Sequence, residues 1–209
     1  MLFVSFENMT QTSSSPSHTN WANPAPAGLT AYALACLCYW AILTGRAPES
    51  SLPMFGAWLL GGFVILLVVA FVELRSGYLL GGNMFLVLSG FFMFSGGLSL
   101  LLQGWGFAST TEINGYAMVV LLLTLVLWTP AYLKISPKAM GWLVLLLDVG
   151  VFFFTLLKLG WISKGFGSSL AGWSLAFSGL LGIYTAAAIE LNSAFNAKVL
   201  PLGKSILKN

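Results

Sequence analysis

The chain has 209 residues, of which 58% are hydrophobic and only 7% are charged, and its formal net charge is +3. Soluble domains carry about 25% charged residues, so this much apolar surface predicts an all-α integral membrane protein. The small net charge offers no basic patch of the kind that binds nucleic acid. One His and two Cys cannot supply a usual structural zinc site, and no metal or other cofactor is expected.

The N-terminal segment differs in composition from the rest of the chain. Residues 1–22 lack the basic region of a signal peptide, and residues 9–20 are polar and rich in Ser and Thr. Such a segment has too little apolar surface to fold by itself. We predict that residues 1–22 form a disordered cytoplasmic tail, that residues 23–190 form the membrane domain, and that residues 191–209 form a second cytoplasmic tail.

The first apolar segment opens on a short, proline-rich motif. Its residues are Asn23, Pro24, Ala25, Pro26, Ala27, Gly28 and Leu29. The prolines hold φ near about −65° and remove two backbone N–H donors, which suits the start of a helix and not its middle. The Asn23 side chain can cap free N–H groups, and the partial positive charge of a first turn favours an anion. The motif therefore predicts a rigid, weakly electropositive helix start.

Six apolar segments approach the ~20 residues that a bilayer core requires. They cover about 26–45, 54–72, 80–102, 114–132, 139–159 and 168–189. A protein with six spans and almost no soluble loops usually moves a solute across the membrane. We therefore expect six transmembrane helices around a pore in each protomer.

Lys and Arg are distributed unevenly between the two sides of this predicted bundle. With the N-terminus in the cytoplasm, six of the nine lie inside and three outside. Because cytoplasmic segments carry an excess of Lys and Arg, both termini are expected in the cytoplasm. The inside group is Arg75, Lys134, Lys138, Lys198, Lys204 and Lys208, and the outside group is Arg46, Lys158 and Lys164.

Two carboxylates are candidates for proton coupling. Asp148 lies at the midpoint of the fifth segment, where an ionised carboxylate costs roughly 2.5–3.5 kcal/mol on insertion scales. It is either a proton-titrating or solute-contacting group in a pore, or a carboxyl group satisfied by a neighbouring helix or subunit. Glu73, at the inner end of the second segment, either interacts with solvent beside Arg75 or forms part of a polar cytoplasmic mouth.

Asn83, at the head of the third segment, resembles Asn23 at the head of the first. Both lie on the predicted cytoplasmic side. Two Asn-capped helix starts facing each other would form an inner vestibule, and two unrelated caps are the alternative.

No catalytic motif is recognisable in the sequence. It contains no G-x-S-x-G, H-E-x-x-H or P-loop motif and no closely spaced carboxylate pair, so an enzyme is not expected. A membrane scaffold or sensor without transport is a further alternative, but the near absence of soluble segments argues against it.

Three stretches resemble the acetate uptake transporters, also called the succinate–acetate permease family. Residues 23–29 are similar to the family signature N-P-A-P-L-G-L, and Glu73, Gly77 and Phe85 follow the family's E…G…F pattern. Residues 190–205 contain E-L-N-S-A-F and then V-L-P-L-G-K-S, similar to the family's C-terminal segment. The chain departs from the pattern in having Ala27 where the signature has Leu, and Tyr78 where the family has Asn.

The resemblance implies a fold, an activity and an assembly. The fold would be six helices around a narrow pore, and the protein a homo-hexamer in the cell membrane, in contact with the lipid bilayer. The solute would be acetate or a related short monocarboxylate, with succinate in some members, moved by a channel-like or proton-coupled route. A channel for urea or short amides is the alternative, because a related six-helix hexameric fold serves that purpose.

The resemblance also implies roles for individual residues. It places a pore constriction at Tyr32 on the first span, at Leu88 or Ser89 on the third and at Gly150 on the fifth. It places solute binding in the opening motif, at Asn23, Pro24, Ala25, Pro26, Gly28 and Leu29.

Overall fold

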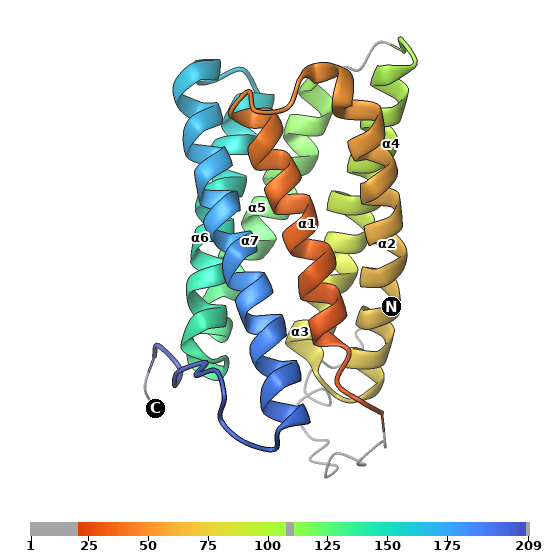
Figure 1. Cartoon of the computed structure of the whole chain (residues 1–209). Coiled ribbons are helices and arrows are strands. Elements are labelled where there is room, and N and C mark those ends of the chain that lie inside the picture. The colour runs from red at the N-terminus through yellow and green to blue at the C-terminus, as the bar shows by residue number, and fades with distance from the viewer. Residues whose placement is uncertain (1–20, 108–110, 208–209) are drawn as a thin grey trace, which may run out of the picture.

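The computed structural model describes residues 21–107 and 111–207, and every regular element in these two ranges is helical. The helices stand side by side in one bundle (Figure 1). They are α1 (Ala25–Leu43), the short 3₁₀ turn η2 (Glu49–Ser51), α2 (Leu52–Arg75), α3 (Leu79–Val87), η3 (Leu88–Phe94), α4 (Ser95–Gly104), α5 (Thr111–Ile135), α6 (Lys138–Lys158) and α7 (Lys164–Ala194).

The described residues contain six helical segments that are long and apolar enough to cross a membrane. The third of these spans consists of α3, η3 and α4, which follow one another without a break. The prediction of an all-helical chain with six spans is confirmed. The last span differs most from the sequence estimate, because α7 has 31 residues and extends beyond residues 168–189 at both ends. Hydropathy locates the bilayer core and not the helix end, and the flanking polar residues continue the helix without a break.

The third span contains a π-helical segment, η3. The Ser95 hydroxyl donates to the carbonyl of Gly90, five residues earlier, at 3.0 Å. In this segment Phe92 is buried and Phe91 is exposed. Single π turns inside α-helices occur often at functional sites, and they change which side chains point inward. Hydropathy cannot predict this change, because the whole segment is apolar.

The six spans form a closed ring in the order α1, α2, third span, α5, α6 and α7. Small residues allow the closest approaches. Gly179 of α7 lies against Cys36 of α1, and Gly182 lies against Tyr32 one turn further along. Such contacts are typical of membrane helices, where small residues let backbones pack tightly.

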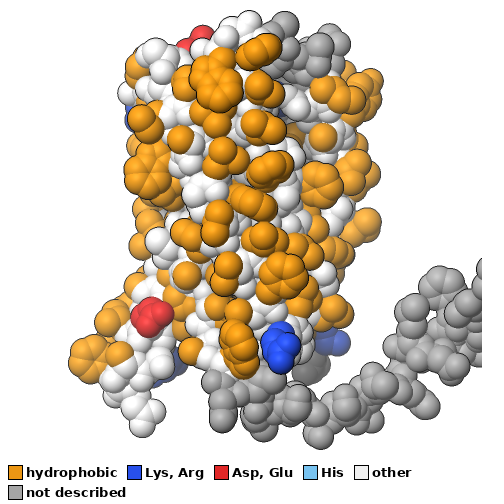
Figure 2. All heavy atoms as spheres, turned by 90° about the vertical axis from the view of Figure 1, so that its right-hand side faces the viewer, with side chains coloured by type: hydrophobic (Ala, Val, Ile, Leu, Met, Phe, Trp, Pro, Cys, Tyr) orange, Lys and Arg blue, Asp and Glu red, His pale blue; other side chains and the backbone are white. Residues whose placement is uncertain are grey.

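Hydrophobic side chains cover the outer face of the bundle over most of its length. Figure 2 shows them on one side, with the visible charged side chains toward the two ends. Exposed residues on α2 include Val64, Val68 and Phe71. This distribution is the one expected for a multi-pass membrane protein surrounded by lipid.

The start of α1 and the end of α7 lie at the same end of the bundle (Figure 1). Of the predicted N-terminal tail, residues 1–20 lie outside the described residues. The described part of the C-terminal tail folds back onto the bundle. The amide of Ala139 donates to the carbonyl of Leu202 at 3.0 Å, and the amide of Leu207 donates to the carbonyl of Leu133 at 2.9 Å. These bonds attach the tail on both sides of the turn between α5 and α6.

Candidate functional site

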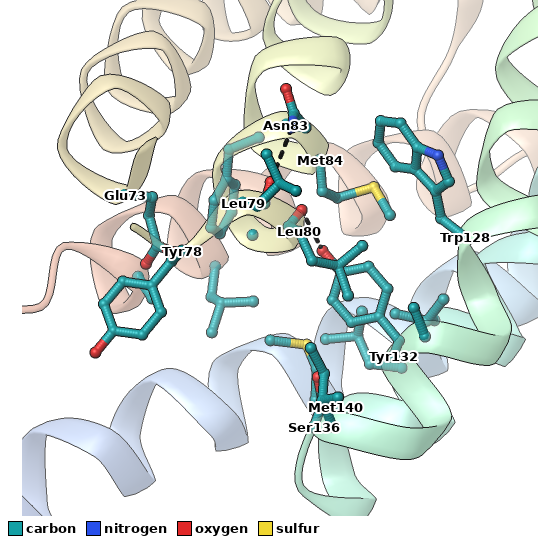
Figure 3. Close-up of a pocket in the computed structure, with 18 of the residues that line it drawn as sticks. Glu73, Tyr78, Leu79, Leu80, Asn83, Met84, Trp128, Tyr132, Ser136 and Met140 are labelled. Atoms are coloured by element: carbon teal, nitrogen blue, oxygen red, sulfur yellow. Dashed lines mark hydrogen bonds between the residues drawn. The ribbon is translucent and has the colours of Figure 1, made fainter. Parts of the chain in front are cut away.

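A cavity of about 860 Å³ lies at the end of the bundle where α1 begins. Its volume falls in the usual range of small-molecule sites, about 300–1,000 Å³, and exceeds what a molecule of acetate size needs. Figure 3 shows side chains from several helices directed into it. The residues that line it include Asn23, Ala25, Leu29, Tyr32, Glu73, Tyr78, Asn83, Met84, Leu88, Trp128, Tyr132, Ser136, Met140 and Leu147.

The start of α1 has the predicted cap but not the predicted free donors. The Asn23 Oδ1 atom accepts from the amide of Ala25 at 2.9 Å, which confirms the cap. Pro26 has no N–H, and the amide of Ala27 donates to the carbonyl of Pro24 at 3.1 Å. The expectation that backbone donors of this turn meet an anion is therefore wrong. With Oδ1 engaged, the Asn23 amide nitrogen is the donor that this turn can offer to a solute.

The other motif residues divide between the cavity wall and helix packing. Asn23, Ala25 and Leu29 line the cavity, whereas Pro24, Pro26 and Gly28 do not. A methyl group on Gly28 would come within 2.7 Å of the Phe85 ring. Gly28 thus permits a close approach of α1 to α3.

Tyr32 is held in place by a hydrogen-bond relay across three helices. Its hydroxyl lies 2.6 Å from the Ser178 Oγ atom, and Ser178 donates its one proton to the carbonyl of Leu143 at 2.7 Å. Tyr32 must therefore donate to Ser178. The ring is only 2% exposed. Tyr32 acts as a fixed wall, because its hydroxyl proton is already used.

Tyr32, Leu88 and Leu147 stand at the inner end of the cavity. Each is the lining residue farthest along its own helix from the open mouth, on α1, η3 and α6 respectively. Tyr32 and Leu88, two of the predicted constriction residues, therefore both line the inner end of the cavity. On α6, Leu147 lines the same end.

The other two predicted constriction residues do not line the cavity. Gly150 faces α7, where a methyl group on it would come within 2.9 Å of the Leu175 side chain. It lies three residues beyond Leu147, almost one turn further along α6. Ser89 is 1% exposed, and its hydroxyl has no hydrogen-bond partner among the described residues.

The two candidate proton-coupling residues lie in different environments. Glu73 is 7% exposed and lines the cavity, and Gly81 of α3 leaves the space that its carboxylate occupies. This position corresponds to the polar mouth. Asp148 does not line the cavity. Its Oδ2 atom accepts from the Thr129 hydroxyl at 2.6 Å, which joins α6 to α5. The Oδ2 atom of Asp148 thus has a partner on a neighbouring helix, whereas its buried Oδ1 atom has none among the described residues.

Asn83 lines the cavity with Asn23, as the vestibule interpretation requires, but it is not a cap. It lies four residues inside α3, and its amide donates back to the carbonyl of Leu79 at 3.0 Å (Figure 3). The hydroxyl of Tyr132 similarly donates to the carbonyl of Leu80 at 3.1 Å. These two bonds fix the polar side chains of the α3 and α5 walls.

The cavity wall is mainly apolar and carries few polar groups. Among the described residues that line it, none is Lys or Arg. No group of three or more His, Cys, Asp or Glu with a geometry suited to a metal ion occurs in the described part of the chain. A carboxylate would therefore be held weakly, which suits a path from which solutes must also leave.

No family model matches this chain, and no curated protein sequence matches it. Its fold is similar to that of a solved structure, the bacterial acetate channel SatP. The TM-score is 0.77 at 20% sequence identity, over 88% of this chain and 99% of the other. The likeness extends over the whole channel protein, so the complete six-helix fold is shared.

Sequence reasoning missed several wall residues that the structure brings together. Trp128 and Tyr132 on α5 lie four residues apart, as do Leu143 and Leu147 on α6. This spacing places each pair on one helix face, and it was the available signal. It is weak in a membrane helix, because apolar residues also cover the faces toward lipid and toward other helices.

Proposed function

We propose that the chain is a member of the acetate uptake transporter family and conducts acetate and related short monocarboxylates across the cell membrane. The observation that carries the proposal is the SatP-like fold over nearly the whole chain. The cavity of about 860 Å³ between the opening motif and Tyr32 supports it. A cavity of this size also accommodates succinate, as a second candidate solute.

The path begins at the mouth formed by Asn23, Tyr78 and Ser136. The Asn23 amide nitrogen and the positive end of the α1 dipole attract the carboxylate there. Further in, the wall is apolar, and Tyr32 and Leu88 restrict passage by size and by exclusion of water. Glu73 lines the cavity and Asp148 does not. This position supports Glu73 as the group that couples protons to transport.

Flux into proteoliposomes containing the purified full-length protein tests this proposal. Labelled acetate should accumulate well above empty liposomes, and Asn23→Ala should lower the rate several-fold. Gln103→Ala removes an exposed amide at the opposite end of the third span and serves as the matched control. Folded wild-type protein that gives no uptake above empty liposomes would rule out the function.

A channel for urea or short amides is the second candidate, because no cation lines the cavity among the described residues. Stopped-flow shrinkage of proteoliposomes in urea, compared with internal acidification driven by acetate, separates the two functions. We expect acidification without a urea response.

We also propose a homo-hexamer with both termini in the cytoplasm. The Lys and Arg distribution supports the orientation. The exposed apolar faces of the bundle offer surfaces for protomers to pack against. Native mass spectrometry from detergent should show six copies, and a monomer alone would contradict the assembly.

A further inference from the structure

We propose that four buried aromatic side chains centred on Tyr39 form a second closure, which determines the size of carboxylate that passes. This closure is separate from the level of Tyr32 and Leu88 and lies on the far side of it from the cavity. The proposal rests on the proposed function, because it names residues that select the transported solute.

Tyr39 contacts three other aromatic rings. Its ring centroid lies 4.7 Å from Phe55, 5.0 Å from Phe92 and 5.3 Å from Phe154. All four residues are buried, none more than 8% exposed. They come from α1, α2, η3 and α6, so a single residue joins four helices.

These contacts cross the interior of the bundle. In the ring of helices, α7 stands between α1 and α6, and α2 stands between α1 and the third span. A contact of Tyr39 with Phe154 or with Phe92 therefore passes through the middle of the ring. Tyr39 follows Tyr32 by seven residues on α1, which places it about 10 Å further along the same face. The cavity and the aromatic cluster are thus successive along the bundle axis.

The π-helical segment determines the position of Phe92. Within η3, Phe92 is 2% exposed and its neighbour Phe91 is 51% exposed. One turn later, Gly96 leaves room for the Tyr39 hydroxyl, which would lie 3.3 Å from a methyl group at that position. The π-helical segment therefore carries one inward aromatic ring, and Gly96 near the start of α4 accommodates another.

A carboxylate cannot cross this cluster without moving it, because packed aromatic rings leave no room for the solute or its water. Tyr39 touches each of the other three rings, so one rotation of its side chain releases all three contacts. The volume opened by that rotation limits the solute. Replacing one of the rings with a smaller side chain enlarges that volume permanently.

The experiment compares labelled butyrate with labelled acetate in proteoliposomes of the full-length protein. Phe92→Ala should raise the butyrate-to-acetate flux ratio by about tenfold, the effect expected when a site gains room for one or two methylenes. Phe154→Ala should act in the same direction. The matched control is Phe91→Ala, which removes an exposed ring from the same segment and should leave the ratio at the wild-type value.

Two conservative variants keep the test decisive if an alanine variant does not fold. Phe92→Leu should raise the ratio less than Phe92→Ala but in the same direction. Tyr39→Phe keeps the ring and should keep the wild-type ratio. An unchanged ratio in folded Phe92→Leu and Phe154→Ala overturns the closure, and so does a changed ratio in Tyr39→Phe.

A neutral probe separates this proposal from the proposed function. Glycerol permeability, followed by stopped-flow light scattering, should rise in Phe92→Ala above the wild type whichever solute the protein carries. Wild-type protein without acetate flux but with this rise would refute acetate transport and support the closure. Acetate flux in the wild type, with no change in glycerol permeability or flux ratio in Phe92→Ala, would support acetate transport and refute the closure.

Discussion

At the scale of single residues, polar groups in the core of this bundle are few, and two of them link helices through specific hydrogen bonds. Ser178 links Tyr32 to the backbone of α6, and Thr129 links Asp148 to α5. In an apolar interior, a polar group that loses its partner is left unsatisfied, and this is more costly than the loss of the bond alone. The cost of removing one member of such a pair therefore depends on whether the member left behind still has another partner.

Ser178→Ala should destabilise the protein more than Tyr32→Phe. Without Ser178, the buried Tyr32 hydroxyl has no partner, whereas without the Tyr32 hydroxyl, Ser178 still donates to Leu143. We expect a loss of about 1 kcal/mol for Ser178→Ala, the order measured for hydrogen bonds between membrane helices. Thermal unfolding in detergent measures it, with the half-buried Ser174→Ala as control. Equal losses in the two variants would contradict the direction of the relay.

Glu73→Gln should abolish the pH dependence of acetate flux, and Asp148→Asn should preserve it. Glutamine mimics a permanently protonated carboxyl group in the cavity wall, so flux at high pH should resemble the wild-type flux at low pH. Asparagine keeps an oxygen that accepts from Thr129. Flux measured from pH 5 to 8 (about the physiological range in which such coupling operates) tests both. A profile lost only in Asp148→Asn would assign coupling to Asp148.

At the scale of elements, glycine determines how closely the helices approach. Gly28, Gly150 and Gly182 each sit where a neighbouring side chain occupies the space of a β-carbon. Gly61 on α2 has nothing within 4 Å of that position. The same residue type therefore serves helix packing at some positions and faces open space at another.

Gly28→Ala should lower stability by about 1–3 kcal/mol, the usual cost of overpacking. The added methyl group would lie 2.7 Å from the Phe85 ring and 3.1 Å from Val69, so α1 must move away from α2 and α3. Gly61→Ala is the matched control, and it should be neutral or slightly stabilising because alanine favours the helix. The thermal midpoint in detergent is the measurement, and a Gly28→Ala midpoint equal to the control would contradict this role.

Asn192→Ala should detach the C-terminal tail from the bundle. The Asn192 side chain both donates to the carbonyl of Leu200 and accepts from its amide, each at 2.9 Å. Without this pair of hydrogen bonds, hydrogen exchange should accelerate at the amides of Ala139 and Leu207. These two amides form the hydrogen bonds that hold the tail against α5 and α6. Ser193→Ala, at an exposed neighbour, should leave exchange unchanged. Protection retained in Asn192→Ala would show that the tail is held elsewhere.

At the scale of the whole molecule, an even number of spans brings both ends of the chain to one side. The cavity opens at that same end, between the start of α1 and the turn that joins α5 to α6. The docked tail covers the outside of this turn. The mouth of the cavity, the opening motif and the C-terminal motif therefore belong to one region of the protein.

Epitope tags at the two termini should be protected together in intact cells and accessible together in inverted membrane vesicles. Six spans require this pairing, and the excess of Lys and Arg on that side determines the direction. Antibody binding on both preparations measures it. Tags found on opposite sides would contradict the six-span topology, and both tags outside would reverse the orientation.

The sequence by itself determined the bilayer as solvent, the six spans and the cap at Asn23, because these depend on composition, segment length and local hydrogen bonding. Only the tertiary structure decided which side chains meet. Val68 is 56% exposed and Val69 is 2% exposed, although they are chemically identical neighbours. In lipid, a helix face toward the bilayer is as apolar as a face toward the core, so hydropathy cannot tell them apart. For that reason hydropathy could not show that Leu147 lines the cavity, that Gly150 packs against α7, or that Asp148 faces α5.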